Sequence, residues 1–116
     1  MNLSRDMEEK RNTDRKLVRQ LLRVMDRNNH AVLGNLVNLS PEGFMLISPN
    51  ALVEGGYSEL ELELPKIVNG RSRIAVDARC IWCQKSSYSD DYGAGFQIER
   101  IPEQDMRALR MVFGGI

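Results

Sequence analysis

Alternating hydrophobic and polar positions dominate the chain from residue 21 onward and predict short β-strands. In the clearest case, Leu60, Leu62 and Leu64 fall on one face of a strand that starts at Ser58, and three glutamates form its wet face. Pro65 and the Asn69-Gly70 pair are expected to close this strand. Alternation or compact apolar runs between turn residues mark further strand segments: 21–26, 30–39, 44–48, 74–82 and 93–100.

The hydrophobic period changes after Pro102, which suits the first turn of a helix. Met106, Leu109 and Phe113 then recur at helical spacing. We therefore predict an all-β fold with a terminal helix. A small six-stranded antiparallel β-barrel with a C-terminal α-helix would span residues 21–116, after a flexible N-terminal arm over residues 1–20. A barrel removes exposed strand edges, and the helix can cover one opening.

Composition supports one globular domain and argues against several classes of protein. The 116 residues are 42% hydrophobic and 28% charged, within the range of folded chains. Sixteen basic and sixteen acidic side chains cancel, so binding to duplex DNA is not expected. The sequence has no apolar run long enough for a membrane span, no secretion signal and only two cysteines, which indicates a cytoplasmic location.

Candidates for catalysis or metal binding are weak. The chain has one histidine, His30, and no recognisable nucleophile, metal or phosphate-loop motif, so we expect neither an enzyme nor a metal site. Cys80 and Cys83 match a C-x-x-C pattern. Strand alternation would point these thiols to opposite faces unless a bulge intervenes. We interpret them as structural thiols.

Positive charge is concentrated near the N-terminus, where the first 40 residues hold eight basic and five acidic side chains. Arg11 and Arg15 are four residues apart, which places both on one side of a helix or of an extended chain. Arg15 and Arg19 have the same spacing and form an alternative pair. Arginine suits phosphate and guanine because its guanidinium group is a flat, forked donor.

A second polar group ends the predicted strand 30–39. Asn38 and Ser40 are two residues apart and should point the same way, whereas Leu39 should point into the core. Gly43 permits a backbone conformation that other residues avoid, and a close approach of a ligand. By itself, this segment is also compatible with an ordinary hairpin turn.

Together, the Arg-x-x-x-Arg spacing and the Asn-x-Ser-x-x-Gly turn resemble the signature of the PilZ domain family. The resemblance covers most of the chain. Residues 36–48 resemble the second motif with its flanking strands, and residues 22–27 resemble the first barrel strand of one subgroup. Trp82 and the Gly95-Phe96 pair also fit the family.

The resemblance implies a receptor for cyclic di-GMP, a bacterial second messenger, with no other cofactor. In this reading, Arg11 and Arg15 would clamp phosphate and guanine. Asn38 and Ser40 would bond a guanine edge, and Gly43 would keep the turn open.

Two positions differ from many family members. Asn38 stands where many have aspartate, and an amide accepts hydrogen bonds less strongly than a carboxylate. Lys10 precedes Arg11 where some members have another arginine, which leaves open whether one ligand or a stacked pair binds. Lys10 and Arg19 are possible additional contacts.

The resemblance implies an adaptor that changes conformation on binding and regulates a separate, unidentified effector protein, with motility, biofilm or polysaccharide output. One alternative is a PilZ-like interaction adaptor that does not bind nucleotide. Another is a small barrel that binds single-stranded nucleic acid, which would need aromatic platforms beside the arginines. The sequence leaves the oligomeric state open.

Overall fold

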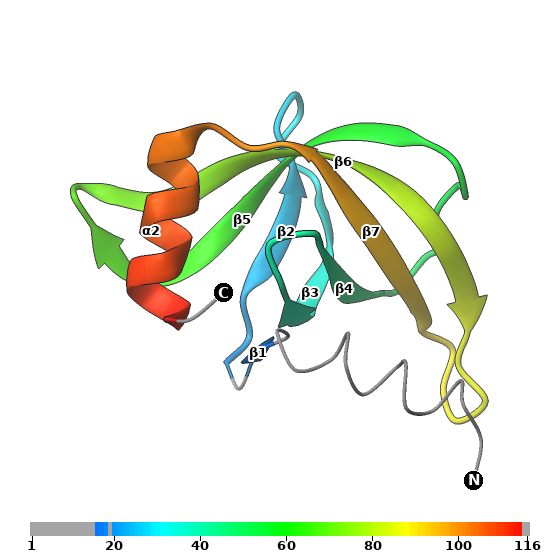
Figure 1. Cartoon of the computed structure of the whole chain (residues 1–116). Coiled ribbons are helices and arrows are strands. Elements are labelled where there is room, and N and C mark those ends of the chain that lie inside the picture. Colours follow the sequence, from blue (N-terminus) through cyan, green and yellow to red (C-terminus); the bar gives the residue numbers. More distant parts are fainter. Residues whose placement is uncertain (1–15, 19, 115–116) are drawn as a thin grey trace, which may run out of the picture.

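The computed structural model describes residues 16–18 and 20–114, which form a small β-barrel and one helix (Figure 1). The arm predicted over residues 1–20 lies largely outside the described residues, as do Lys10, Arg11, Arg15 and Arg19. The described elements are, in chain order, strands β1 (Lys16–Leu17), β2 (Arg23–Asp26), β3 (Val32–Leu39), β4 (Gly43–Ser48), β5 (Tyr57–Val68), β6 (Arg71–Lys85) and β7 (Tyr92–Arg100), and helix α2 (Glu103–Phe113).

Strands β2 to β7 close into an antiparallel barrel. The hydrogen-bonded order is β3-β2-β5-β6-β7-β4, and β4 pairs back onto β3 to complete the ring. The short strand β1 adds to β3 beside the ring. The predicted six-stranded barrel with a C-terminal helix is therefore confirmed.

The inner wall of the barrel and the helix share one hydrophobic core. Leu60, Leu62 and Leu64 all point inward and are buried, as the alternation predicted. Phe44 and Phe96 stack across neighbouring strands with ring centroids 5.2 Å apart. Helix α2 lies against the β5–β6 hairpin (Figure 1) and buries Leu109 completely, so it extends the core beyond the barrel.

We expected strand β5 to end at Pro65, but it continues to Val68. The pairing with β6 is interrupted between Glu63 and Val68, so Pro65 lies in an irregular stretch where a missing N–H group does little harm. The hairpin turns at Asn69 and Gly70, which have φ angles of 51° and 76°. These angles are typical of the tight turns that join two strands.

A β-bulge at Ile81 changes the expected orientation of the two cysteines. Cys80 pairs with Phe96 and Trp82 with Gly95, so Ile81 is one extra residue in β6. The bulge is the exception that the sequence left open, and with it Cys80 and Cys83 both pack against the core. Burial raises the pKa of the Cys80 thiol, which makes it a poor nucleophile and fits a structural role.

A buried carboxylate fixes helix α2 to the sheet. Asp105, in the first turn of the helix, is 2% exposed. Its Oδ2 accepts a hydrogen bond from the Ala75 N–H at 3.0 Å, and its Oδ1 forms an ion pair with Arg71. One side chain therefore joins the helix to two positions near the start of β6, Arg71 and Ala75.

We predict that Asp105→Ala lowers the free energy of unfolding by about 2–4 kcal/mol, because the partly buried Arg71 guanidinium and the Ala75 N–H lose their acceptor. Urea denaturation of the purified protein measures this. Glu103→Ala is the matched control, since Glu103 is in the same helical turn but exposed, and should change stability by less than about 0.5 kcal/mol. Equal losses in the two variants would contradict the anchoring role.

Candidate functional site

Strand β1 brings the arginine-rich segment to the end of β3. Lys16 pairs with Leu39 and Leu17 with Asn38, and the Val18 N–H donates to the Val37 carbonyl at 2.9 Å. The Arg11–Arg15 motif ends one residue before Lys16 in the sequence. Consecutive Cα atoms lie about 3.8 Å apart. The segment that carries the first motif therefore ends beside β3, the strand that carries the second motif.

Ser40 is buried at the corner between β3 and β4. It is 2% exposed, and its Oγ accepts hydrogen bonds from the N–H groups of Glu42 and Gly43, each at 3.3 Å. Its own N–H donates to the Gly43 carbonyl at 2.8 Å. In this state, the hydroxyl expected to face a ligand stabilises its own turn. Leu39 is fully buried, as predicted.

Gly43 is required for a different reason from the one expected. Its φ angle is not positive, so the turn needs no special conformation there. A Cβ atom at Gly43 would lie 2.2 Å from the carbonyl oxygen of Phe96. Gly43 therefore permits the close approach of β4 to β7, because any side chain would separate these strands.

Asn38 belongs to a line of residues that crosses the outer wall. Direct strand pairing joins five residues, here called the Asn38 row: Leu17, Asn38, Met45, Gly95 and Trp82. Directly paired residues share a face of the sheet, so their side chains lie on one surface. The Asn38 Nδ2 group lies 3.8 Å from the Met45 Sδ.

Trp82 packs over Gly93 and Gly95, two positions of β7 that have no side chain. A Cβ atom at Gly95 would be only 2.1 Å from the Trp82 Nε1, and one at Gly93 would be 3.5 Å from its six-membered ring. The indole is 39% exposed. In the sequence, Trp82 was noted only because it fits the family, and its packing on β7 was not predicted. The two glycines at alternate positions of a strand were the signal for this close packing.

An open groove of about 390 Å³ continues from this wall beyond Trp82. Its apolar lining comes from Met45, Ile47, Trp82 and Tyr92, and its far side is the turn between β6 and β7 with Lys85. We call it the hairpin groove.

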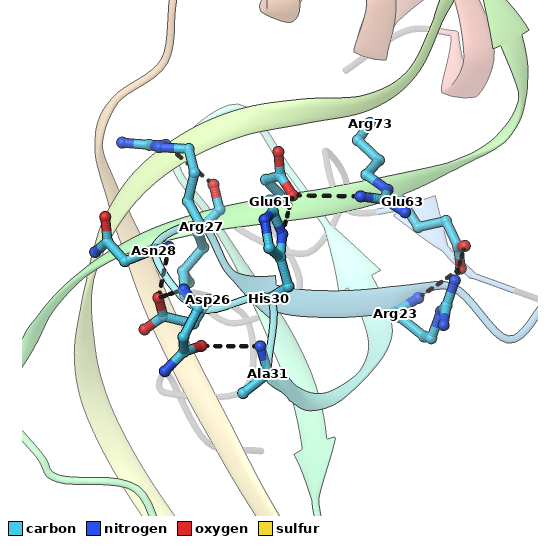
Figure 2. A network of polar contacts seen from close by, with 11 residues as sticks. Arg23, Asp26, Arg27, Asn28, His30, Ala31, Glu61, Glu63 and Arg73 are labelled. Carbon is cyan, nitrogen blue, oxygen red and sulfur yellow. Dashed lines mark hydrogen bonds and ion pairs between the residues drawn. The ribbon is translucent and has the colours of Figure 1, made fainter.

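The opposite wall, over β2 and β5, is covered by ion pairs (Figure 2). Arg23 binds Glu63 at 2.8 Å, and Glu61 lies between His30 and Arg73 at 3.9 and 3.8 Å. The glutamates of β5 do face outward, as predicted, but Glu61 and Glu63 are only 22% and 25% exposed beside these partners. The arginines on this wall are engaged with carboxylates, so it is a poor surface for an anionic ligand.

Hydrogen bonds to arginine change the acidity of two carboxyl groups on this wall. Arg27 donates to Asp77 at 2.7 Å and lowers the pKa of Asp77, and Arg23 likewise lowers the pKa of Glu63. In both cases, partial burial opposes the shift. The ionised forms are therefore stabilised by folding.

The described residues place this chain among small antiparallel β-barrels with a C-terminal helix, and sequence comparison identifies the family. The PilZ domain model matches residues 9–114. The chain therefore belongs to the PilZ domain family. No curated protein sequence matches it.

Two solved structures share the fold. The inhibitor of motility MotI/DgrA from Bacillus subtilis matches with a TM-score of 0.67 and 18% identity, over 85% of this chain. This chain spans 46% of that protein. The PilZ domain of YcgR from Escherichia coli, solved with c-di-GMP, matches with a TM-score of 0.58 and 16% identity, over 82% of this chain and 80% of that one.

Over residues 16–18 and 20–114, no helix is long and apolar enough to cross a bilayer. In the same part of the chain, histidine, cysteine and acidic side chains form no group of three that could bind a metal ion.

We predict that Ser40→Ala lowers the free energy of unfolding by about 1–2 kcal/mol, because two buried N–H groups of the turn lose their acceptor. Thermal and urea denaturation measure this. Ser72→Ala, on the exposed part of β6, is the control and should behave like the wild type. A Ser40→Ala protein with unchanged stability would show that the hydroxyl is available to a ligand instead.

We predict that the free energy of unfolding falls on acidification below about pH 4, where carboxylates take up protons. Asp77 and Glu63 have a lower pKa in the folded state than in the unfolded state. Their stabilising contribution is thus present at neutral pH and disappears as the pH falls through the folded-state pKa. Asp77→Asn should flatten this dependence. Asp90→Asn, at a fully exposed side chain, should not, and identical pH profiles for all three proteins would contradict the assignment.

Proposed function

We propose that this protein is a cyclic di-GMP receptor that regulates a separate partner protein. The observation that carries this proposal is the pairing of β1 with β3. Because of this pairing, the C-terminal end of the arginine segment lies beside Asn38, at one end of the Asn38 row. Membership of the PilZ family supports it, as does the YcgR PilZ domain, which was solved with c-di-GMP.

The two halves of the proposed site supply complementary chemistry. The Asn38 row has no charged member, so the phosphates need cations from elsewhere, and Arg11 and Arg15 supply them with forked donors. The Asn38 amide matches the mixed donors and acceptors of a guanine edge. Trp82 offers an exposed aromatic plane on which a guanine base can stack, as bases do on aromatic side chains.

Ser40 and Gly43 have a supporting role in this proposal. The Ser40 hydroxyl accepts a hydrogen bond from the Gly43 N–H within the turn, and the missing side chain of Gly43 lets β7 pack closely against β4. Both hold the corner from which Asn38 faces the ligand. Lys10 and Arg19 are candidates for further phosphate contacts, and Lys10 bears on whether one nucleotide or a stacked pair binds.

The output of the proposed receptor is a change in the surface that it offers to a partner. Arg11 and Arg15 would be fixed over the outer wall only while nucleotide is bound, since the ligand supplies their partners. Ordering the backbone costs about 1–2 kcal/mol per residue, so only a few residues around the arginines need to be fixed. The fold shared with a protein named as an inhibitor of motility makes a motility partner the first to test.

We predict that Arg11→Ala and Arg15→Ala each weaken cyclic di-GMP binding about tenfold to a hundredfold, the loss of one charge-assisted contact. Isothermal titration calorimetry with cyclic di-GMP measures the affinity and the stoichiometry, and GTP is the ligand control. Arg5→Ala, another arginine of the same segment, is the matched variant and should bind like the wild type.

Other outcomes would redirect the proposal. If Arg15→Ala weakens binding and Arg11→Ala does not, Arg15 and Arg19 form the working pair. If the wild-type protein does not bind the nucleotide at all, the receptor proposal is wrong, and a PilZ-like interaction adaptor takes its place.

A further inference from the structure

The hairpin groove forms where strand β7 has no side chains at two successive outward positions. Gly95 is paired with Met45 of β4 and with Trp82 of β6. Gly93, two residues earlier and on the same face, is paired with Ile47 of β4. The wall is therefore open where these side chains are missing, and Gly93 is part of the groove lining, between Met45 and Trp82.

Apolar and aromatic side chains of the groove are exposed to solvent. Ile47 is 42% exposed and Trp82 is 39% exposed, and Tyr88 in the β6–β7 turn is 98% exposed. Such side chains gathered at one exposed place are typical of the anchor points of protein interfaces. The groove volume of about 390 Å³ lies at the lower end of the range for ligand sites, which suits the side chains of a short peptide segment.

Hydrogen bonds within the β6–β7 turn fix the backbone that carries Tyr88. The Ser86 N–H donates to the Asp91 carbonyl at 2.8 Å, and the Ser86 Oγ accepts from the Tyr88 N–H at 3.0 Å. The Asp91 N–H donates to the Ser89 Oγ at 3.2 Å. A partner that covers the Tyr88 ring therefore loses little free energy in ordering this turn.

The rim of the groove is acidic overall. Residues 84–93 carry two negative charges, Asp90 and Asp91, and one positive charge, Lys85. The Lys85 Nζ lies 3.9 Å from the Asp90 Oδ1, and both side chains are exposed, so water weakens this pair. The excess negative charge disfavours phosphate and favours a lysine or arginine of a partner. The groove thus suits a different ligand from the neutral Asn38 row.

We propose that the hairpin groove docks the partner protein through a segment that carries an apolar side chain next to a lysine or arginine. The proposal rests on the proposed function, which supplies the need for a partner, and it names where that partner binds. The turn between β6 and β7 lies on the side of the barrel away from helix α2 (Figure 1), and the groove shares Trp82 with the Asn38 row. A docked partner would therefore lie beside the proposed nucleotide site.

The test uses peptides in the absence of cyclic di-GMP. A display library of random peptides is selected on the purified full chain, and the affinity of enriched peptides is measured by fluorescence polarisation. Peptides with an aliphatic or aromatic residue beside a lysine or arginine should be enriched. Tyr88→Ser and Ile47→Ser should each weaken their binding roughly 5- to 30-fold, because apolar area that the peptide covers is lost. Ile67→Ser changes an exposed isoleucine of β5 outside the groove lining and should bind the peptides like the wild type.

A charge exchange tests the chemistry of the occupant. Asp90→Lys with Asp91→Lys should weaken the enriched peptides about tenfold, and should improve binding of the same peptides with each basic residue replaced by glutamate. The melting temperature and the cyclic di-GMP affinity of this variant and of Tyr88→Ser should equal those of the wild type, because these positions are exposed and lie outside the Asn38 row.

Several results would overturn the docking site. If no peptide of this kind is enriched, or if Tyr88→Ser and Ile47→Ser bind the peptides like the wild type, the partner docks elsewhere. If cyclic di-GMP displaces the peptides, the groove belongs to the nucleotide site. If the wild type forms dimers that Tyr88→Ser abolishes, a second copy fills the groove. If the peptides bind as expected but cyclic di-GMP does not bind, the docking site stands and the receptor proposal fails.

Discussion

The close fit of strand β4 between its neighbours is the constraint on which the rest of the structure depends. A Cβ atom at Gly34 would lie 2.1 Å from the Ile47 carbonyl oxygen, and one at Gly43 would lie 2.2 Å from that of Phe96. Neither glycine has a positive φ angle, so both are required for space and not for conformation. A larger residue at either position would open the ring at the strands that carry Asn38 and Met45. The same two close contacts therefore close the barrel and fix the shape of its outer wall.

The same barrel presents two chemically different walls. Over β2, β5 and the adjacent part of β6, arginines and carboxylates neutralise one another, which stabilises the fold but leaves little free charge. Over β3, β4, β7 and β6, the Asn38 row has no charged side chain, and Trp82 packs on Gly95. A neutral wall gives an anionic ligand shape and stacking but no counter-charge. In the proposed site, such a ligand takes its counter-charge from basic residues beside the wall, of which the segment that ends at Lys16 supplies Arg11 and Arg15.

Patterns with a fixed period were read correctly from the sequence, whereas local departures from the period were not. Leu60 and Leu109 were assigned to the core because several residues around each repeat the same spacing. The strand through Pro65 was cut short because irregular pairing beside a proline leaves no trace in a hydrophobic pattern. The Ile81 bulge likewise shifts the phase by one residue, which turns Cys83 inward. The inward turn of Ser40 depends on the turn it closes, which residue spacing does not encode.

The proposed division of the nucleotide site between the barrel wall and the segment before β1 has a consequence for signalling. If one nucleotide bridges both, then a partner that binds the bridged surface better than the open one must raise nucleotide affinity by the same factor. A typical coupling of about 1–3 kcal/mol corresponds to roughly 5- to 150-fold in either affinity. The wall contributes little to this coupling, because its strands are fixed by close backbone contacts such as that of Gly43. The coupling must therefore come from the segment before β1, whose position the ligand would determine.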